Sequence, residues 1–338
     1  MCYAIPGKVI DIDRDIVTIE YFGEKRKAKN EFFKLTDGDY VYAQGGFVVQ
    51  KIPTKEALPI LEAWRELFFK LKEIDQKLTQ NPKNLYEKAN NLRQKYHGNS
   101  CCIHGIMEFS NYCCNDCLYC GLRHSNAQLK RYRMDTEEIV KACEYAIKEL
   151  NFKALVLQSG EDYRYDEKRL VDVVRRIMES FPVLLILSIG ERDIEIYKKL
   201  YKAGARGILI RFETSNQRLY EEYRRGKKLL NRINLIKELR KIGYLVFTGF
   251  LIGLPQQTEE DILKDIELAY SLEPEMFSFG PFIPHPNTPL KDAPVPSVDL
   301  VLTTIAKTRL MYPESRILVT TALETLDKEN GARLGLLS

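Results

Sequence analysis

Residues 108–121 read Glu-Phe-Ser-Asn-Tyr-Cys-Cys-Asn-Asp-Cys-Leu-Tyr-Cys-Gly, with Cys113, Cys117 and Cys120 spaced as C-x3-C-x2-C. This spacing brings three thiolates onto one loop, close enough to share one iron–sulfur cluster. Three ligands on a four-iron cube leave one iron without a protein donor, and such an open position can take a substrate or cofactor. Tyr119, directly before the last cysteine, places an aromatic ring beside that iron.

Two other uses of these cysteines compete with the cluster. A zinc site needs a fourth ligand at short spacing, and Cys101, Cys102 and Cys114 are the nearest thiols. A disulfide framework is disfavoured, because eight cysteines in 338 residues are not dense and the chain opens without a secretory signal. We therefore expect a reducing, cytoplasmic location, where an oxygen-sensitive cluster survives.

The composition narrows the class of protein further. With 51 basic and 47 acidic residues the net charge is only +4, so nucleic acid is not a favoured partner. No apolar run reaches the roughly 18 residues of a membrane span. A hydrophobic content of 45% is ordinary for a globular protein, and the length suits a barrel with one extra module.

The first part of the chain reads as a small all-β domain. Short β-branched and aromatic segments alternate with turns, which favours a closed, OB-like antiparallel barrel over residues 1–53. Residues 54–78 and 85–96 have helical periodicity, so residues 54–99 are predicted to form a helical linker.

From residue 100 to residue 338, apolar runs alternate with helical patterns, which predicts a parallel α/β sheet. Polar residues end many of the runs, and in a (β/α) barrel of the TIM type that edge carries the active site. We count seven strands, the last at 316–321, and the helical stretch 323–336 ends before an eighth.

The cysteine motif resembles the radical S-adenosylmethionine (SAM) signature. In that superfamily SAM chelates the open iron of a 4Fe-4S cluster, and reduction cleaves it to a 5′-deoxyadenosyl radical. From about His104 to Thr321 the chain further resembles the HydE family of radical SAM maturases of FeFe-hydrogenase. Methylornithine synthase and biotin synthase share the same barrel. The resemblance is carried by residues 108–111, 117–123, 131–134, 157–162, 280–286 and 320–322.

The resemblance implies roles for residues at the strand ends. The methionine amino group of SAM would be bound at the edge formed by residues 159–161, and Glu213 would accept hydrogen bonds from the ribose hydroxyls. Arg232 would hold the carboxylate in a two-bond fork. The alternatives are a plain strand-to-helix turn, a salt bridge of Glu213 with Arg211, and a solvated helix face. The expected SAM contacts are Tyr119, Ser159, Gly160, Glu161, Ser188, Glu213 and Arg232.

On the substrate side we expect Arg211, Thr320 and Thr321. A cationic fork and two hydroxyl groups suit an anion, such as a carboxylate or a cyanide-bearing iron complex. Strand propensity alone is the alternative explanation of the two threonines.

The N-terminus resembles another hydrogenase assembly family. Residues 1–7 (Met-Cys-Tyr-Ala-Ile-Pro-Gly), 37–41 and 45–47 are similar to the HypC family of small chaperones. The resemblance implies that Cys2 helps to carry an iron bearing cyanide and carbon monoxide. Gln44 stands where that family usually has a histidine, so a docking module with an ordinary cysteine remains the alternative.

Taken together, the sequence predicts a radical SAM enzyme that uses a 4Fe-4S cluster and SAM in hydrogenase metallocofactor maturation. Its expected partners are a small-molecule or iron-complex substrate, other maturation proteins and a low-potential electron donor. The alternatives are an amino-acid carbon-skeleton rearrangement like that of methylornithine synthase, and a non-catalytic iron-complex carrier or scaffold.

Overall fold

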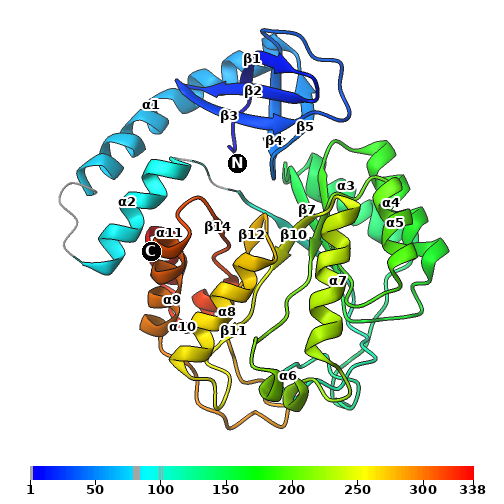
Figure 1. The fold of residues 1–338 in the computed structure, drawn as a ribbon. Helices are drawn as coiled ribbons and strands as arrows, with labels where there is room; N and C mark the ends of the chain where they lie inside the picture. Colours follow the sequence, from blue (N-terminus) through cyan, green and yellow to red (C-terminus); the bar gives the residue numbers. More distant parts are fainter. Residues whose placement is uncertain (1–2, 79–83, 99, 101) are drawn as a thin grey trace.

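The computed structural model describes residues 3–78, 84–98, 100 and 102–338, so Cys2 and Cys101 lie outside the described residues. It contains a small β-barrel, a pair of helices and a larger α/β domain (Figure 1). The small barrel closes in the order β1-β2-β3-β5-β4, which confirms the predicted N-terminal barrel. Its strands are β1 (Gly7–Asp13), β2 (Ile16–Tyr21), β3 (Glu24–Lys29), β4 (Tyr40–Gln44) and β5 (Phe47–Ile52).

Strand β3 is not predicted by the sequence pattern, because Ala28 is its only apolar residue. The strand forms through its hairpin with β2. Phe22 and Gly23 have φ angles of 49° and 90°, as in the two-residue turns whose twist matches paired strands. Tyr21 then pairs with Glu24, and the buried Ala28 faces the barrel core.

Two helices, α1 (Thr54–Leu78) and α2 (Leu85–His97), connect the domains, as their periodicity predicts. Phe68 of α1 packs into the core of the small barrel. Helix α2 packs along α9 (Val298–Met311) of the larger domain, where Arg309 Nη1 lies 3.1 Å from His97 Nε2. The helical segment is therefore fixed at both ends.

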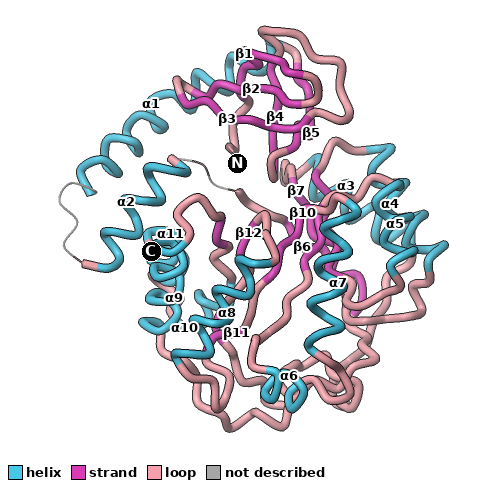
Figure 2. The backbone as a smooth tube through the Cα atoms, viewed as in Figure 1, coloured by secondary structure: helices cyan, strands magenta, loops and turns pink. Residues whose placement is uncertain are grey.

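The larger domain is built on a seven-stranded parallel sheet in the order β14-β12-β10-β9-β8-β7-β6. This is an open barrel with β6 and β14 at its edges, which confirms the expected incomplete TIM-type barrel. Figure 2 shows the strands inside and the helices around them. The strands are β6 (Gly105–Ser110), β7 (Ala154–Ser159), β8 (Leu184–Ser188), β9 (Gly207–Leu209), β10 (Leu245–Thr248), β12 (Met276–Phe277) and β14 (Arg316–Ile317), with β11 (Leu251–Ile252) pairing with β13 (Gly280–Pro281) beyond them.

The helices follow the predicted alternation except near the end of the chain. The strand expected at 316–321 stops at Ile317, and the helix expected at 323–336 is two short helices. Helix α6 is a further element that the pattern does not predict. Besides α9, the helices are α3 (Thr136–Lys148), α4 (Glu167–Ser180), α5 (Ile194–Lys202), α6 (Gln217–Tyr223), α7 (Leu229–Ile242), α8 (Glu259–Ser271), α10 (Thr321–Leu326) and α11 (Gly331–Leu337).

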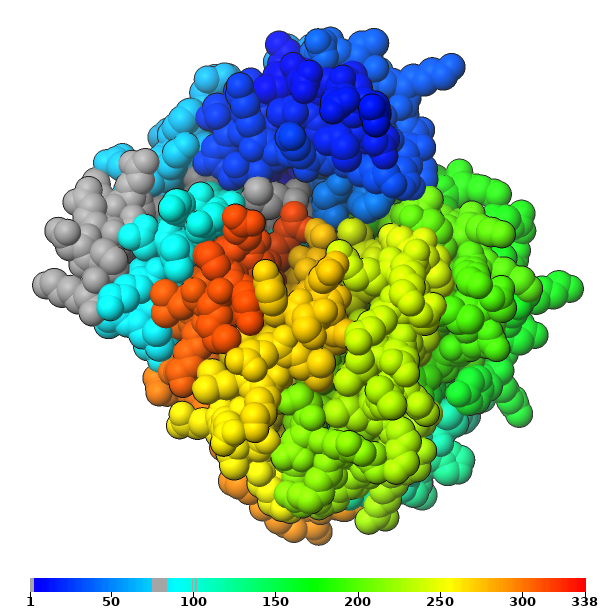
Figure 3. Space-filling view, viewed as in Figure 1, coloured from blue at the N-terminus to red at the C-terminus, as the bar shows by residue number. Residues whose placement is uncertain are grey.

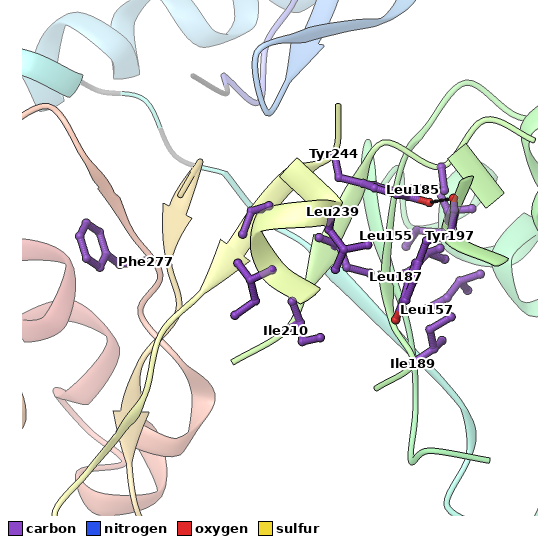
Figure 4. Packing of buried hydrophobic residues seen from close by; sticks show 14 of the residues in the cluster. Leu155, Leu157, Leu185, Leu187, Ile189, Tyr197, Ile210, Leu239, Tyr244 and Phe277 are labelled. Carbon is purple, nitrogen blue, oxygen red and sulfur yellow. Dashed lines mark hydrogen bonds between the residues drawn. The ribbon is translucent and has the colours of Figure 1, made fainter. Parts of the chain in front are cut away.

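The sheet is buried on both faces, which explains its nearly continuous apolar strands. Leu155 and Leu157 of β7 belong to the core cluster that also includes residues of the outer helices (Figure 4). Within that layer Tyr244 Oη donates a 2.8 Å hydrogen bond to the carbonyl oxygen of Tyr197. Val156, between the two leucines, packs instead in a cluster with residues of the small barrel.

The small barrel therefore docks at the amino ends of the large-domain strands. Figure 3 shows it packed against the larger domain. The turn between β4 and β5 makes the contact: a Cβ on Gly45 would lie 2.7 Å from Leu184 and 3.1 Å from Leu245. These leucines begin β8 and β10. Docking at this end leaves the carboxyl end of the sheet for the candidate site. None of the described helices has the length and apolarity required to span a lipid bilayer.

Candidate active site

The three motif cysteines lie on the loop between β6 and α3, at the carboxyl end of the first barrel strand. Cys117 is buried, Cys113 and Cys120 are half-buried, and Cys114 is exposed. The structure thus separates Cys114, which falls outside the motif spacing, from the three that fit it.

Backbone hydrogen bonds tie this loop to two other parts of the site. The amide of Cys114 donates to the carbonyl oxygen of Glu161 at 3.0 Å, and the amide of Leu118 donates to that of Tyr223 at 2.9 Å. Glu161 follows β7 and Tyr223 ends α6, so the loop is held from both sides.

Two glycines allow close packing around the loop. A Cβ on Gly160 would lie 2.2 Å from the carbonyl oxygen of Tyr112 and 2.8 Å from Cys113 Cβ. A Cβ on Gly121 would lie 2.6 Å from the ring of His285. Neither position has room for a larger residue, which gives a packing reason for Gly160 separate from its predicted contact with SAM.

The burial of the three motif cysteines affects the ionisation of their thiols. Burial is the main cause that raises the pKa of all three thiols, and for Cys120, where Cys117 and Cys113 add to the effect, the pKa is about 11. Within the described part of the chain, no three Cys, His, Asp or Glu side chains are close enough to hold one metal ion.

Beside the loop lies a cluster of five charged side chains, of which Glu161, Arg224 and Arg232 are buried and Glu191 and Lys227 are half-buried. Glu161 Oε1 lies 3.6 Å from Arg224 Nη2 and 3.7 Å from Arg232 Nη2, and its Oε2 lies 3.4 Å from Lys227 Nζ. Glu191 lies 3.0 Å from Lys227 and 2.9 Å from Arg232. Burial works to raise the pKa of Glu191, but Arg232 and Lys227 outweigh it and the pKa is lowered. Three cations face two carboxylates, so the cluster can accept one more negative charge.

Two of these cations have unused donors. Arg224 Nε and Arg232 Nε are buried and make no hydrogen bond, because the Arg232 N–H is not aligned with the nearby Glu191 oxygen. Arg232 is 4% exposed, which excludes the solvated helix face as its environment. Buried donors without a partner are costly, and a carboxylate ligand would satisfy them.

Glu213 occupies a strained position opposite this cluster. Its φ angle is 67°, in the left-handed region, which costs roughly 1–3 kcal/mol for a residue other than glycine. Its Oε2 is buried without a hydrogen bond, although Arg211 Nη2 lies 3.4 Å away. The salt bridge with Arg211 exists but leaves the carboxylate able to accept from a ligand hydroxyl.

The remaining predicted residues are more dispersed. Ser159 donates its hydroxyl to the carbonyl oxygen of Gly160 at 2.7 Å, and Ser188 ends β8. Thr320 and Thr321 begin helix α10 rather than end a strand, so the strand explanation of these threonines is wrong. Among the described interactions, no hydrogen bond or ion pair joins either threonine to Arg211, although all three lie on the carboxyl side of the sheet.

Sequence reasoning missed Arg224 and Lys227. They lie in the run Arg-Arg-Gly-Lys-Lys at 224–228, which is typical of a solvated loop. Two tyrosines before the run, Tyr220 and Tyr223, are buried, and such aromatic residues were the available signal that the segment turns inward.

Comparison with known proteins agrees with this geometry. Residues 107–269 match the radical SAM superfamily, and residues 1–64 match the HupF/HypC family. The FeFe-hydrogenase maturase subunit HydE of Thermotoga maritima is 41% identical over 242 residues, which cover 72% of this chain and 69% of that protein. This chain belongs to the radical SAM superfamily.

Two further relatives support the assignment. The 3-methylornithine synthase of Methanosarcina acetivorans is 32% identical over 245 residues, covering 72% of this chain and 69% of that protein. The crystal structure of methylornithine synthase (PylB) superposes with a TM-score of 0.69 at 27% identity, covering 79% of each chain. The barrel is therefore that of a HydE-like radical SAM enzyme, and it carries an N-terminal domain of the HupF/HypC family.

The residues present fit the cofactors that this superfamily implies. Cys113, Cys117 and Cys120 supply three thiolates on a buried loop, as a site-differentiated 4Fe-4S cluster requires. Arg224 and Arg232, whose Nε atoms make no hydrogen bond, suit the carboxylate of SAM, and Glu213 Oε2, which accepts no hydrogen bond, suits a ribose hydroxyl.

Proposed function

We propose that this chain binds a 4Fe-4S cluster and SAM at the carboxyl end of its barrel, cleaves SAM reductively, and acts in hydrogenase metallocofactor maturation. The observation that carries the proposal is the buried cluster of Glu161, Arg224 and Arg232 beside the cysteine loop. A carrier or scaffold needs neither a surplus buried cation nor unpaired buried donors.

Each residue of the site has a defined task in this proposal. Cys113, Cys117 and Cys120 hold the cluster, which together with SAM supplies a reactive carbon radical when bound. Arg232 and Arg224 orient the carboxylate of SAM, and Glu161 accepts from its ammonium group. The carboxylate and the ammonium group of SAM complete the pairing of these buried groups.

Glu213 and Arg211 divide the site between cofactor and substrate. The Glu213 carboxylate accepts hydrogen bonds from the ribose hydroxyls. The residue has a positive φ angle. Arg211 then offers its remaining N–H groups to an anionic substrate. Thr320 and Thr321 would add hydroxyl donors at the start of α10.

The role in hydrogenase maturation rests on the pairing of the two domains. A HydE-like barrel and a HupF/HypC domain are each related to hydrogenase assembly proteins, and here they share one chain. We infer that the substrate is a small molecule or an iron complex, received from or passed to other maturation proteins. A low-potential electron donor would reduce the cluster.

The test is reductive cleavage of SAM by the anaerobically reconstituted chain. We expect dithionite to produce methionine and 5′-deoxyadenosine, and we expect deletion of the chain to abolish hydrogenase activity in a maturation-competent host. Absence of SAM cleavage at full cluster occupancy would refute the proposal.

Methylornithine synthesis is the second candidate, because PylB has a similar fold and a methylornithine synthase is 32% identical. Mass spectrometry after incubation with a panel of free amino acids separates the two. Formation of 3-methylornithine would favour this candidate, whereas restored hydrogenase activity without it favours maturation.

A further inference from the structure

At the amino end of the barrel, opposite the proposed SAM site, lie a cysteine and a histidine, two residue types that bind metal ions. Cys102 and His104 lie just before β6, at the amino edge of the sheet. Cys102 Sγ is 3.0 Å from His104 Nε2 and 3.4 Å from Gln44 Oε1 of the small domain. The His104 ring also packs edge-to-face on Phe247, with centroids 5.7 Å apart. The pair therefore lies in the junction between the domains.

The small domain closes one side of this group. Gln44 is 4% exposed, and its Nε2 donates to the carbonyl oxygen of Tyr3 at 3.3 Å. That bond fixes the amide so that its oxygen faces Cys102. The junction thus holds a thiol, an imidazole and an amide oxygen, contributed by two domains.

We propose that Cys102 and His104 together bind a first-row transition-metal ion at this junction. A thiolate and an imidazole are the ligands that iron, cobalt and zinc of the divalent state share. An imidazole binds a metal ion through a nitrogen lone pair, and His104 directs its Nε2 toward Cys102 Sγ. The two side chains need only a small separation to admit an ion between sulfur and nitrogen.

Two protein ligands leave several coordination positions on the metal for non-protein ligands. Such a site exchanges its metal more readily than a closed four-ligand site, which suits transfer of a metal complex between partners. Binding exchanges the thiol proton of Cys102 for the metal ion and releases that proton to water. In the metal-free chain the Cys102 thiol donates to Gln44 Oε1, and the metal ion replaces the proton of that hydrogen bond.

This site is independent of SAM cleavage, so the two proposals fail separately. The probe is Co²⁺, added to the full chain carrying Cys113→Ala, Cys117→Ala and Cys120→Ala, because the cluster thiols would otherwise bind it. We expect one Co²⁺ with a thiolate-to-cobalt charge-transfer band and release of about one proton per metal. Circular dichroism of every variant checks folding.

Four further variants, each made in the chain that lacks the three motif cysteines, test whether Cys102 and His104 bind the Co²⁺. Cys102→Ser should abolish the band, and His104→Phe, which keeps a ring against Phe247, should also weaken binding strongly. Gln44→Ala removes the acceptor of the thiol hydrogen bond but no ligand, so the charge-transfer band should remain. Cys143→Ala, at a buried thiol of the helix layer, is the control and should change nothing. The proposal is overturned if Cys102→Ser and His104→Phe bind Co²⁺ like their parent, or if the band depends on Cys2 or Cys101 instead of Cys102.

Discussion

The two ends of the large barrel differ in the kinds of side chain that they bury. At the carboxyl end, Glu161, Arg224 and Arg232 are buried charges with unsatisfied donors, and Glu213 has a strained backbone. At the amino end, apolar residues of the small domain cover the strands, and the polar contacts there include the group around Cys102 and the ion pair of Arg206 with Glu31. Stability alone does not select buried, unpaired charge. The difference indicates that the carboxyl end is organised for ligands and the amino end for docking.

The largest expected effect removes the ligands of the carboxyl end. Replacing Cys113, Cys117 and Cys120 by alanine should abolish cluster binding and all SAM cleavage, from about four irons per chain to none. Iron and sulfide analysis with electron paramagnetic resonance measures the loss. Cys114→Ala is the matched control, because its side chain is exposed and outside the motif. Retention of the cluster in the triple variant would show that these cysteines are not its ligands, and the carboxyl end would no longer be assigned as the ligand-binding end.

The next largest expected effect tests whether Arg232, one of the three cations of the charged cluster, binds SAM. Arg232→Ala should weaken SAM binding by roughly 1.5–3 kcal/mol, the range for hydrogen bonds to charged groups, which is about 10- to 150-fold. Arg232→Lys should recover only part, because an ammonium group cannot form the two-bond fork. Isothermal titration calorimetry measures the affinity.

The same change leaves Glu161 and Glu191 less well paired, so thermal melts must accompany it. Lys228→Ala, in an exposed pair with Glu221, is the control and should leave SAM affinity unchanged. Equal affinity in wild type and both Arg232 variants would show that the unpaired Nε does not face SAM.

The sequence predicts the ligand end of the molecule only in part. Local spacing was sufficient to place Cys113, Cys117 and Cys120 on one loop, because they lie in one contiguous segment. The sequence did not predict Arg224 and Lys227 as site residues. Their side chains point inward because of α6, a short helix that the sequence periodicity does not reveal. The barrel strands were predictable from buried apolar runs, whereas β3 formed through its hairpin turn and β14 was shorter than its apolar run.

A third effect concerns the helical connection, which joins the two ends. Burial, and then Arg309, lower the pKa of His97 to about 4, so the folded chain holds a neutral imidazole. Between pH 6.5 and 4 the unfolded chain binds the additional proton, and stability falls as pH falls through this window. The loss should approach about 2–3 kcal/mol. Urea unfolding at pH 7 and pH 5 measures it, and His97→Asn should reduce the pH dependence. An unchanged slope in that variant would contradict the assignment to His97.

The smallest effect tests the docking end, by comparing two glycines in hairpin turns of the small barrel. Gly45 and Gly23 both have positive φ, so alanine at either should cost roughly 1–2 kcal/mol of backbone strain. A Cβ at Gly23 meets nothing within 4 Å, whereas at Gly45 it would lie 2.7 Å from Leu184 Cδ2. Both leucine contacts of Gly45 are the ends of flexible side chains, which can shift, so Gly45→Ala should cost only about 1 kcal/mol beyond Gly23→Ala. Urea unfolding of the two variants measures the difference, and limited proteolysis should cut the Gly45 variant faster between the domains. Equal stability and equal cleavage of the two variants would mean that the β4–β5 hairpin is not closely packed against the large domain. The amino end would then not be a specific docking surface.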